Sequence, residues 1–210
     1  ALTELYGHAL RRHAGDGPYL LGGWSMGGTV AHHLAGALRR DGAPVDLVVM
    51  IDANSPERIV ALEGLDQPRT EAELHLRYLR SIEAFLELGL ADDLDAAGLT
   101  RALTEAGLLH PNDGRRQRLA AFSRHLRDLA DHHAVALDDS VPVVLLRADD
   151  PSPRNARIGM GVDDAYDEPD LGWGPYCPRL RVHRVPGHHY SVIHSPELAP
   201  LVSSALTNGA

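Results

Sequence analysis

A G-x-S-x-G motif at 23–27 constrains the fold of this chain more than any other feature. An apolar run at 18–21 precedes it, and beyond it apolar residues recur at helical spacing over 30–38. The order predicts a strand, a sharp turn and a helix, with Ser25 exposed on the turn as a nucleophile. We expect both glycines of the motif because side chains there would collide with the neighbouring strand and helix.

The rest of the chain predicts a parallel sheet with flanking helices in a single domain spanning 1–210. A helix is expected at 2–13, a second buried strand at 46–51, and two further strands at 141–146 and 180–185.

The long stretch between the second and third expected strands shows no convincing strand pattern. Helices are expected there at 70–86, 95–107 and from about 112 onward, the first opened by a capping box at Thr70 and Glu73. We interpret 54–139 as a helical lid insertion together with a following core helix. Near the chain's end, Ser195 is expected to be the N-cap of the final helix.

Charge and cysteine content exclude several functional classes. The 20 basic and 29 acidic residues give a net charge of −9, which argues against nonspecific nucleic-acid binding. The single cysteine, Cys177, excludes an intrachain disulfide framework and a multi-cysteine metal site. No apolar span long enough for a membrane helix occurs and no signal peptide opens the chain, so we expect a cytoplasmic protein without membrane contact.

A serine hydroxyl becomes a nucleophile when a base takes its proton, and three histidines near the last expected strand are candidates for that base. They are His188, His189 and His194. The tight turn expected at Gly187 would deliver one histidine to the catalytic edge of the sheet, and this placement favours His189.

The acid that orients the histidine has two possible positions in the sequence. Asp52 directly follows the second expected strand, whereas Asp149 and Asp150 follow the third. Both positions lie at the carboxyl ends of strands, so the pattern alone leaves the choice open.

Taken together, these pieces resemble the type I thioesterase domains that end nonribosomal peptide synthetases and modular polyketide synthases. The matching segments occur in the family's order at 23–28, 48–52, 142–148, 171–173 and 185–190. The resemblance implies the α/β-hydrolase fold with a helical lid, and it implies Asp52 as the acid and His189 as the base.

The resemblance also implies a mechanism and a partner. A carrier domain would present a peptide or polyketide chain on its phosphopantetheine, and Ser25 would take the chain while the Met26 N–H stabilises the oxyanion. Water or an internal nucleophile would then release it, and no metal or other bound cofactor is implied. The alternatives are a stand-alone proofreading thioesterase or esterase of the same fold and, from another class, a non-catalytic binding module.

The resemblance further implies early strands and a second oxyanion donor located before the motif. Only 24 residues precede Ser25 in this chain. We therefore expect a domain that is N-terminally incomplete, whose second oxyanion donor comes from residues outside this sequence.

Overall fold

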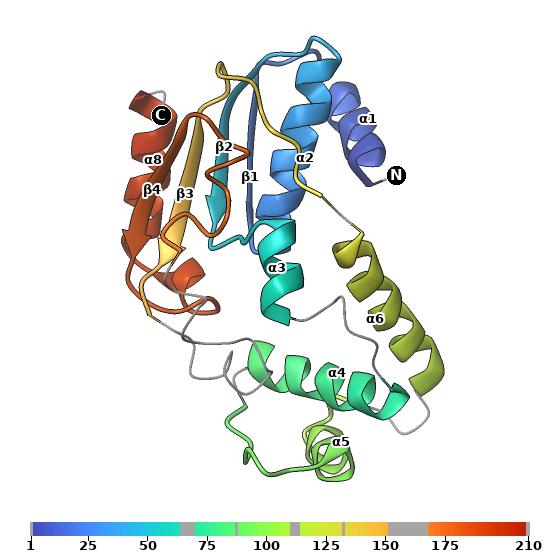
Figure 1. Cartoon of the computed structure of the whole chain (residues 1–210). Helices are drawn as coiled ribbons and strands as arrows, with labels where there is room; N and C mark the ends of the chain where they lie inside the picture. The colour runs from blue at the N-terminus through green and yellow to red at the C-terminus, as the bar shows by residue number, and fades with distance from the viewer. Residues whose placement is uncertain are drawn as a thin grey trace. The chain divides into compact units, whose positions relative to one another are not determined.

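A computed structural model describes most of the chain, and Figure 1 shows the course of the backbone. The described residues are 2–63, 70–86, 88–109, 114–131, 133–150 and 168–208. The chain divides into two compact units, of which the first is formed by 1–58, 133–151 and 164–210 and the second contains 59–132.

The first unit is built on a four-stranded parallel sheet in the order β1-β2-β3-β4. The strands are β1 (Tyr19–Trp24), β2 (Val45–Ile51), β3 (Val143–Ala148) and β4 (Leu180–Val185). All four expected strands are confirmed. Trp24 pairs with Ile51, which pairs in turn with Leu146, so the carboxyl ends of these strands lie level.

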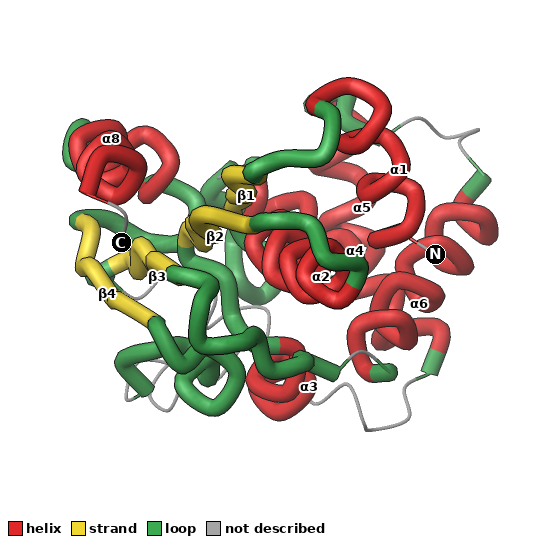
Figure 2. Tube along the Cα trace, turned by 90° about the horizontal axis from the view of Figure 1, so that it is seen from above, coloured by secondary structure: helices red, strands yellow, loops and turns green. Residues whose placement is uncertain are grey.

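Helices cover the two faces of this sheet (Figure 2). They are α1 (Leu2–Ala14), α2 (Met26–Arg40) and α8 (Leu198–Asn208). Helix α1 packs on α2, and α2 packs on β1 and β2, whereas α8 contacts β2 and β3 on the other face.

The side chains of β2 explain why both faces of the sheet are covered. Successive residues of a strand point to opposite faces. Val48 and Met50 accordingly enter the core cluster on the α2 side, while Leu47 and Val49 enter the cluster on the α8 side. A continuous apolar run is the expected signature of a strand buried on both faces.

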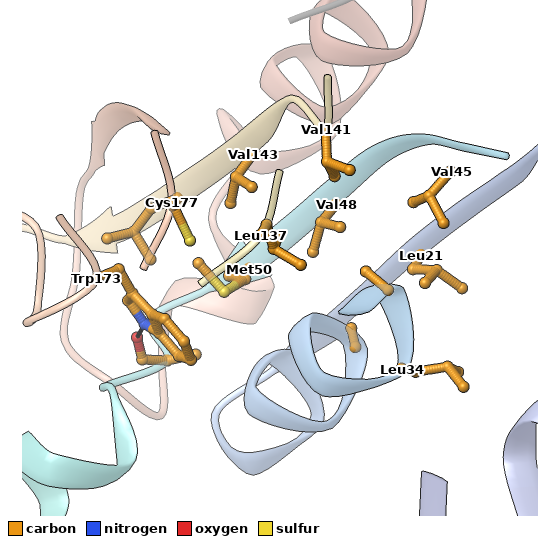
Figure 3. Packing of buried hydrophobic residues seen from close by; sticks show 14 of the residues in the cluster. Leu21, Leu34, Val45, Val48, Met50, Leu137, Val141, Val143, Trp173 and Cys177 are labelled. Carbon is orange, nitrogen blue, oxygen red and sulfur yellow. Dashed lines mark hydrogen bonds between the residues drawn. The ribbon is translucent and has the colours of Figure 1, made fainter. Parts of the chain in front are cut away.

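Figure 3 shows the core on the α2 side, where Trp173 and Cys177 lie beside Met50. Trp173 is fully buried, and its ring packs against the His32 ring at a tilt of 46° with centroids 4.5 Å apart. Burial raises the pKa of the Cys177 thiol to about 12, so this cysteine is not a competing nucleophile.

The second unit is helical, as expected, and the described residues between 54 and 140 contain no strand. Its helices are α4 (Glu71–Phe85), α5 (Ala96–Glu105) and α6 (Arg115–Ala130). Helices α4 and α5 contribute to a small core that includes Leu79, Leu99 and Leu103.

The capping box at the start of α4 is confirmed. The Glu73 carboxylate accepts the Thr70 N–H at 2.7 Å, and the Thr70 hydroxyl accepts the Glu73 N–H at 3.3 Å.

Helix α3 (Pro56–Glu63) was not expected from the sequence. The Ser55 hydroxyl accepts the Arg58 N–H at 3.2 Å, and Pro56 occupies the first helical position. This Ser-Pro pair was the signal that could have predicted the helix.

The expected N-cap role of Ser195 is wrong. A 3₁₀ helix, η2 (Val192–His194), ends just before Ser195, and α8 begins only at Leu198. The Leu198 N–H bonds to the Ser195 carbonyl in a turn, so the chain turns once more before the helix starts. Across the described ranges, no helix is both long and apolar enough to cross a membrane.

Candidate active site

Ser25 lies between β1 and α2 in a strained backbone conformation. Its φ of 54° and ψ of −127° place an L residue in a region that costs free energy. The Ser25 N–H donates to the Ile51 carbonyl at 2.9 Å, and the Ser25 carbonyl accepts from Gly28 N–H at 2.9 Å. These bonds hold the turn from both sides and present the half-exposed side chain at the sheet edge.

The glycines around Ser25 differ in how strictly the turn requires them. A Cβ on Gly23 would lie 2.3 Å from the backbone carbon of Gly27, and one on Gly28 would lie 2.6 Å from the Ala53 Cβ. A Cβ on Gly27 would meet nothing within 4 Å. The expected collision at Gly27 is therefore wrong, since this face of the first helical turn is open.

This difference gives a stability prediction. We expect Gly28→Ala to lower the free energy of unfolding by about 1–3 kcal/mol, because the added methyl group overlaps Ala53. Gly27→Ala is the matched control and should leave stability unchanged or slightly raised. Urea unfolding of both variants measures the difference, and equal stabilities would contradict this account of the turn.

Asp52 lies at the carboxyl end of β2, directly beside the Ser25 turn. Its backbone also adopts a positive φ, 44°, and its N–H donates to the Leu146 carbonyl at 2.8 Å. Its carboxylate is buried and both oxygens have N–H partners. Oδ1 accepts the Ala148 N–H at 2.9 Å, and Oδ2 lies 2.8 Å from His189 Nδ1.

His189 follows β4 on a short loop and faces Asp52. A carboxylate can only accept, so Nδ1 carries the proton in this contact and Nε2 is the basic nitrogen. The loop turns at Gly187, whose φ is 107°, and the Ser191 hydroxyl accepts the His188 N–H at 2.9 Å. The expected glycine turn thus delivers His189 to the sheet edge.

The structure places these three predicted residues at one edge of the sheet. The pairing of Trp24 with Ile51 sets Ser25 next to Asp52. The Trp24 ring lies 5.2 Å from the His189 ring, centroid to centroid, which sets His189 beside the same turn. Among the described residues the Ser25 hydroxyl makes no hydrogen bond to His189. Contacts of this kind often tighten only when substrate binds.

The other carboxylates that the sequence left open have different partners. Asp149 pairs with Arg184 at 3.1 Å, and Asp150 donates its N–H to the Gly187 carbonyl. Both are exposed, and no hydrogen bond from either to His189 occurs in the described part of the chain.

The other two histidines also differ from His189. His188 Nδ1 accepts the Tyr190 N–H at 3.3 Å, and His194 is exposed in η2. The geometry therefore favours the pair formed by Asp52 and His189.

Met26 is the first residue of α2, directly after Ser25. The N–H groups of a first helical turn have no acceptor within their own helix, and the helix dipole favours negative charge there. The Met26 N–H is therefore suited to stabilise an oxyanion formed at a substrate bonded to Ser25.

The sequence did not indicate that the two tryptophans of this chain hold the backbone of the site in place. The Trp24 indole N–H donates to the His189 carbonyl at 2.9 Å, and the Trp173 indole N–H donates to the Ala53 carbonyl at 2.7 Å. One indole therefore holds the loop of the histidine, and the other holds the residue that follows the aspartate. The acceptors are backbone carbonyls, which every residue has, so the sequence gives no signal for these bonds.

Comparisons with known proteins show which family and which fold this chain resembles. The thioesterase domain family model matches residues 1–205. The non-reducing polyketide synthase PKS1 of Zymoseptoria tritici is 24% identical over 220 residues, covering 96% of this chain and 9% of that protein. The chain spans only a small part, 3% to 9%, of the curated polyketide synthases it matches.

Solved structures of similar fold include a whole synthetase and an isolated thioesterase domain. The four-domain nonribosomal peptide synthetase AB3403 matches with a TM-score of 0.68 at 21% identity, covering 99% of this chain and 16% of that one. The thioesterase domain SrfTE, whose structure addresses cyclisation of the lipopeptide surfactin, matches with a TM-score of 0.58 at 16% identity. That match covers 98% of this chain and 74% of SrfTE, and both structures share the parallel α/β architecture described above.

Proposed function

The chain belongs to the thioesterase domain family, and from this premise we propose that it releases a finished peptide or polyketide chain from a carrier domain. The substrate arrives as a thioester of the carrier's phosphopantetheine. The carrier partner is supported by the relatives, which are polyketide synthases, and by the similar fold within a nonribosomal peptide synthetase.

In the proposed first step, Ser25 is acylated. His189 Nε2 takes the hydroxyl proton as the serine oxygen attacks the thioester carbonyl, and Asp52 stabilises the imidazolium that forms. The Met26 N–H stabilises the oxyanion. When the intermediate collapses, the carbon–sulfur bond breaks and the thiol leaves with the proton from His189.

In the second step, His189 takes the proton of the nucleophile that attacks the acyl-serine, and it returns this proton to the Ser25 oxygen when the ester bond breaks. Water gives a free acid, whereas an amine or hydroxyl of the bound chain gives a ring. Both outcomes use the same three side chains of this protein and need no metal or redox group.

One observation carries this proposal. A buried carboxylate with one oxygen fixed by the Ala148 N–H directs its other oxygen to His189 Nδ1 at 2.8 Å, next to a serine on a strained strand-to-helix turn. This combination of orientation and strain is what nucleophilic acyl transfer requires. A non-catalytic binding module would have no use for it.

We propose that the helical second unit is the lid expected from the sequence. The chain leaves the first unit after Arg58, shortly beyond Asp52, and returns at His133. An insertion that follows the acid so closely in the sequence supports this role, in which a lid controls access of water and substrate.

The proposed substrate class can be tested by comparing two kinds of acyl donor. We expect kcat/KM to be at least about tenfold higher for a chain on carrier-bound phosphopantetheine than for a simple ester of the same acyl group, because contacts with the carrier and its arm add binding energy. Mass spectrometry of the product separates an acid from a ring, which is lighter by one water. Equal or faster turnover of the simple ester would favour the stand-alone esterase.

A further inference from the structure

We propose that Trp24 is a positioning residue for His189, holding the loop of the base with its indole N–H and stabilising the protonated imidazole with its ring. This inference rests on the proposed function, because it concerns the same base. The proposal adds Trp24 to the site as a residue that takes no direct part in nucleophilic attack or proton transfer.

The indole N–H connects two distant parts of the first unit. Trp24 ends β1, while His189 follows β4 at the opposite side of the sheet. The Trp24 Nε1 donates to the His189 carbonyl at 2.9 Å across 165 positions of sequence. Since Trp24 pairs with Ile51 in the sheet, its backbone is fixed, and the indole transfers that rigidity to the loop.

This bond complements the one made by the acid. Asp52 holds the imidazole through Nδ1, whereas Trp24 holds the backbone of the same residue. A side chain fixed at only one of these points could still pivot about the other. Held at both, His189 keeps Nε2 in a single direction, as catalysis by proximity and orientation demands.

The indole ring provides a second contribution. It lies against the imidazole at 5.2 Å between centroids with an interplanar angle of 31°, and Tyr190 meets the same imidazole edge-on at 5.1 Å. A cation within about 6 Å of an indole centroid is attracted to the ring face. His189 becomes a cation when it takes the proton of Ser25, so this contact strengthens in the transition state.

Trp24 also has a packing role, which the test has to separate from its role at His189. Its ring also packs against the core cluster on the α8 side, so truncation would disturb the fold as well as the base. Phenylalanine keeps an aromatic ring at this position, although a smaller one, and removes the N–H donor. The pair Trp24→Phe and Trp24→Leu therefore separates the hydrogen bond from the ring contact.

Kinetics provide the first part of the test. With an acyl thioester substrate, Trp24→Phe should lower kcat about 3- to 10-fold with KM unchanged, the effect of one neutral hydrogen bond. Trp24→Leu should lower kcat by a further factor of about three or more, because the cation–π contact is lost as well. Thermal unfolding of both variants shows whether any loss follows stability instead.

Fluorescence provides a readout that a purely structural role would not change. Protonation of an imidazole beside an indole quenches indole emission, so His189 and Trp24 should together contribute a pH-dependent step to the tryptophan fluorescence of the wild-type protein. The same step should be lost in His189→Gln and in Trp24→Phe, whereas any signal from Trp173 beside His32 remains in both variants and is subtracted as background. Asp52, His188 and Tyr190 also face this site, and they remain in both variants.

The proposal is overturned if Trp24→Phe keeps the wild-type kcat, or if the tryptophan fluorescence of His189→Gln keeps the full pH dependence of the wild-type protein. It is also overturned if kcat losses follow the melting temperature in both Trp24 variants. Failure of the proposed function would look different, because the wild-type protein would then release no acyl chain while the fluorescence step remained.

Discussion

Replacing Ser25 by alanine should abolish release of acyl chains, with kcat falling by a factor on the order of 10⁶. Alanine keeps the turn but removes the oxygen that would form the acyl-enzyme. Without this oxygen the Asp52–His189 pair cannot assist formation of an acyl-enzyme. Direct attack of water on the thioester would then be the only route to release. Steady-state kinetics with an acyl thioester measure this loss.

A fluorophosphonate gives an independent measurement of the same prediction. The wild-type protein should gain the mass of one phosphonyl adduct, and Ser25→Ala should gain none. Ser195 provides the matched control, since it lies beyond η2 and its hydroxyl accepts only a long bond from the Glu197 N–H at 3.4 Å. Ser195→Ala should be labelled and turn over like wild type. Labelling of Ser25→Ala would show that the nucleophile is another residue.

The central strands β2 and β3 were predictable because they are buried on both faces of the sheet. A strand such as β2 must be apolar at successive positions, and such a run between two turns has few alternative structures.

Helix starts were less predictable because they depend on single hydrogen bonds. Ser55 caps α3 with its hydroxyl, whereas Ser195, in a similar Ser-Pro-Glu context, contributes its carbonyl to a turn.

The site was predictable as far as strand ends determine it. Ser25, Asp52 and His189 all follow strands, and parallel strands bring their carboxyl ends to one edge. The choice between Asp52 and Asp149 was not predictable from the pattern, because both follow buried strands. The two differ only in the folded chain, where Asp52 is buried at a positive φ and Asp149 pairs with Arg184.

The contact between Trp24 and His189 was not predictable either, because the two residues are far apart in the sequence. Trp24 and His189 meet because a loop after β4 folds back across the sheet edge to β1. No periodicity in the chain encodes that return. Its acceptor is a carbonyl, which every residue has, so composition and spacing carry no signal for it.

Asp52→Asn should lower kcat by a factor on the order of 10⁴ while leaving the fold intact. The two oxygens of Asp52 both accept N–H groups, one from Ala148 and one from His189. An asparagine has one carbonyl oxygen, and if the Ala148 N–H keeps it, the amide NH₂ faces His189 Nδ1. Nδ1 must then accept, so the proton moves to Nε2 and the imidazole can no longer take the proton of Ser25.

Asp150→Asn is the matched control for this substitution. Asp150 is exposed, and its backbone N–H rather than its carboxylate bonds the Gly187 carbonyl beside the histidine loop. The backbone bond survives the substitution, so kcat should change by less than about threefold. Measuring kcat for both variants decides between the two positions that the sequence left open. A large loss in Asp150→Asn together with a small one in Asp52→Asn would move the acid to the loop after β3, and the 2.8 Å contact would then be structural.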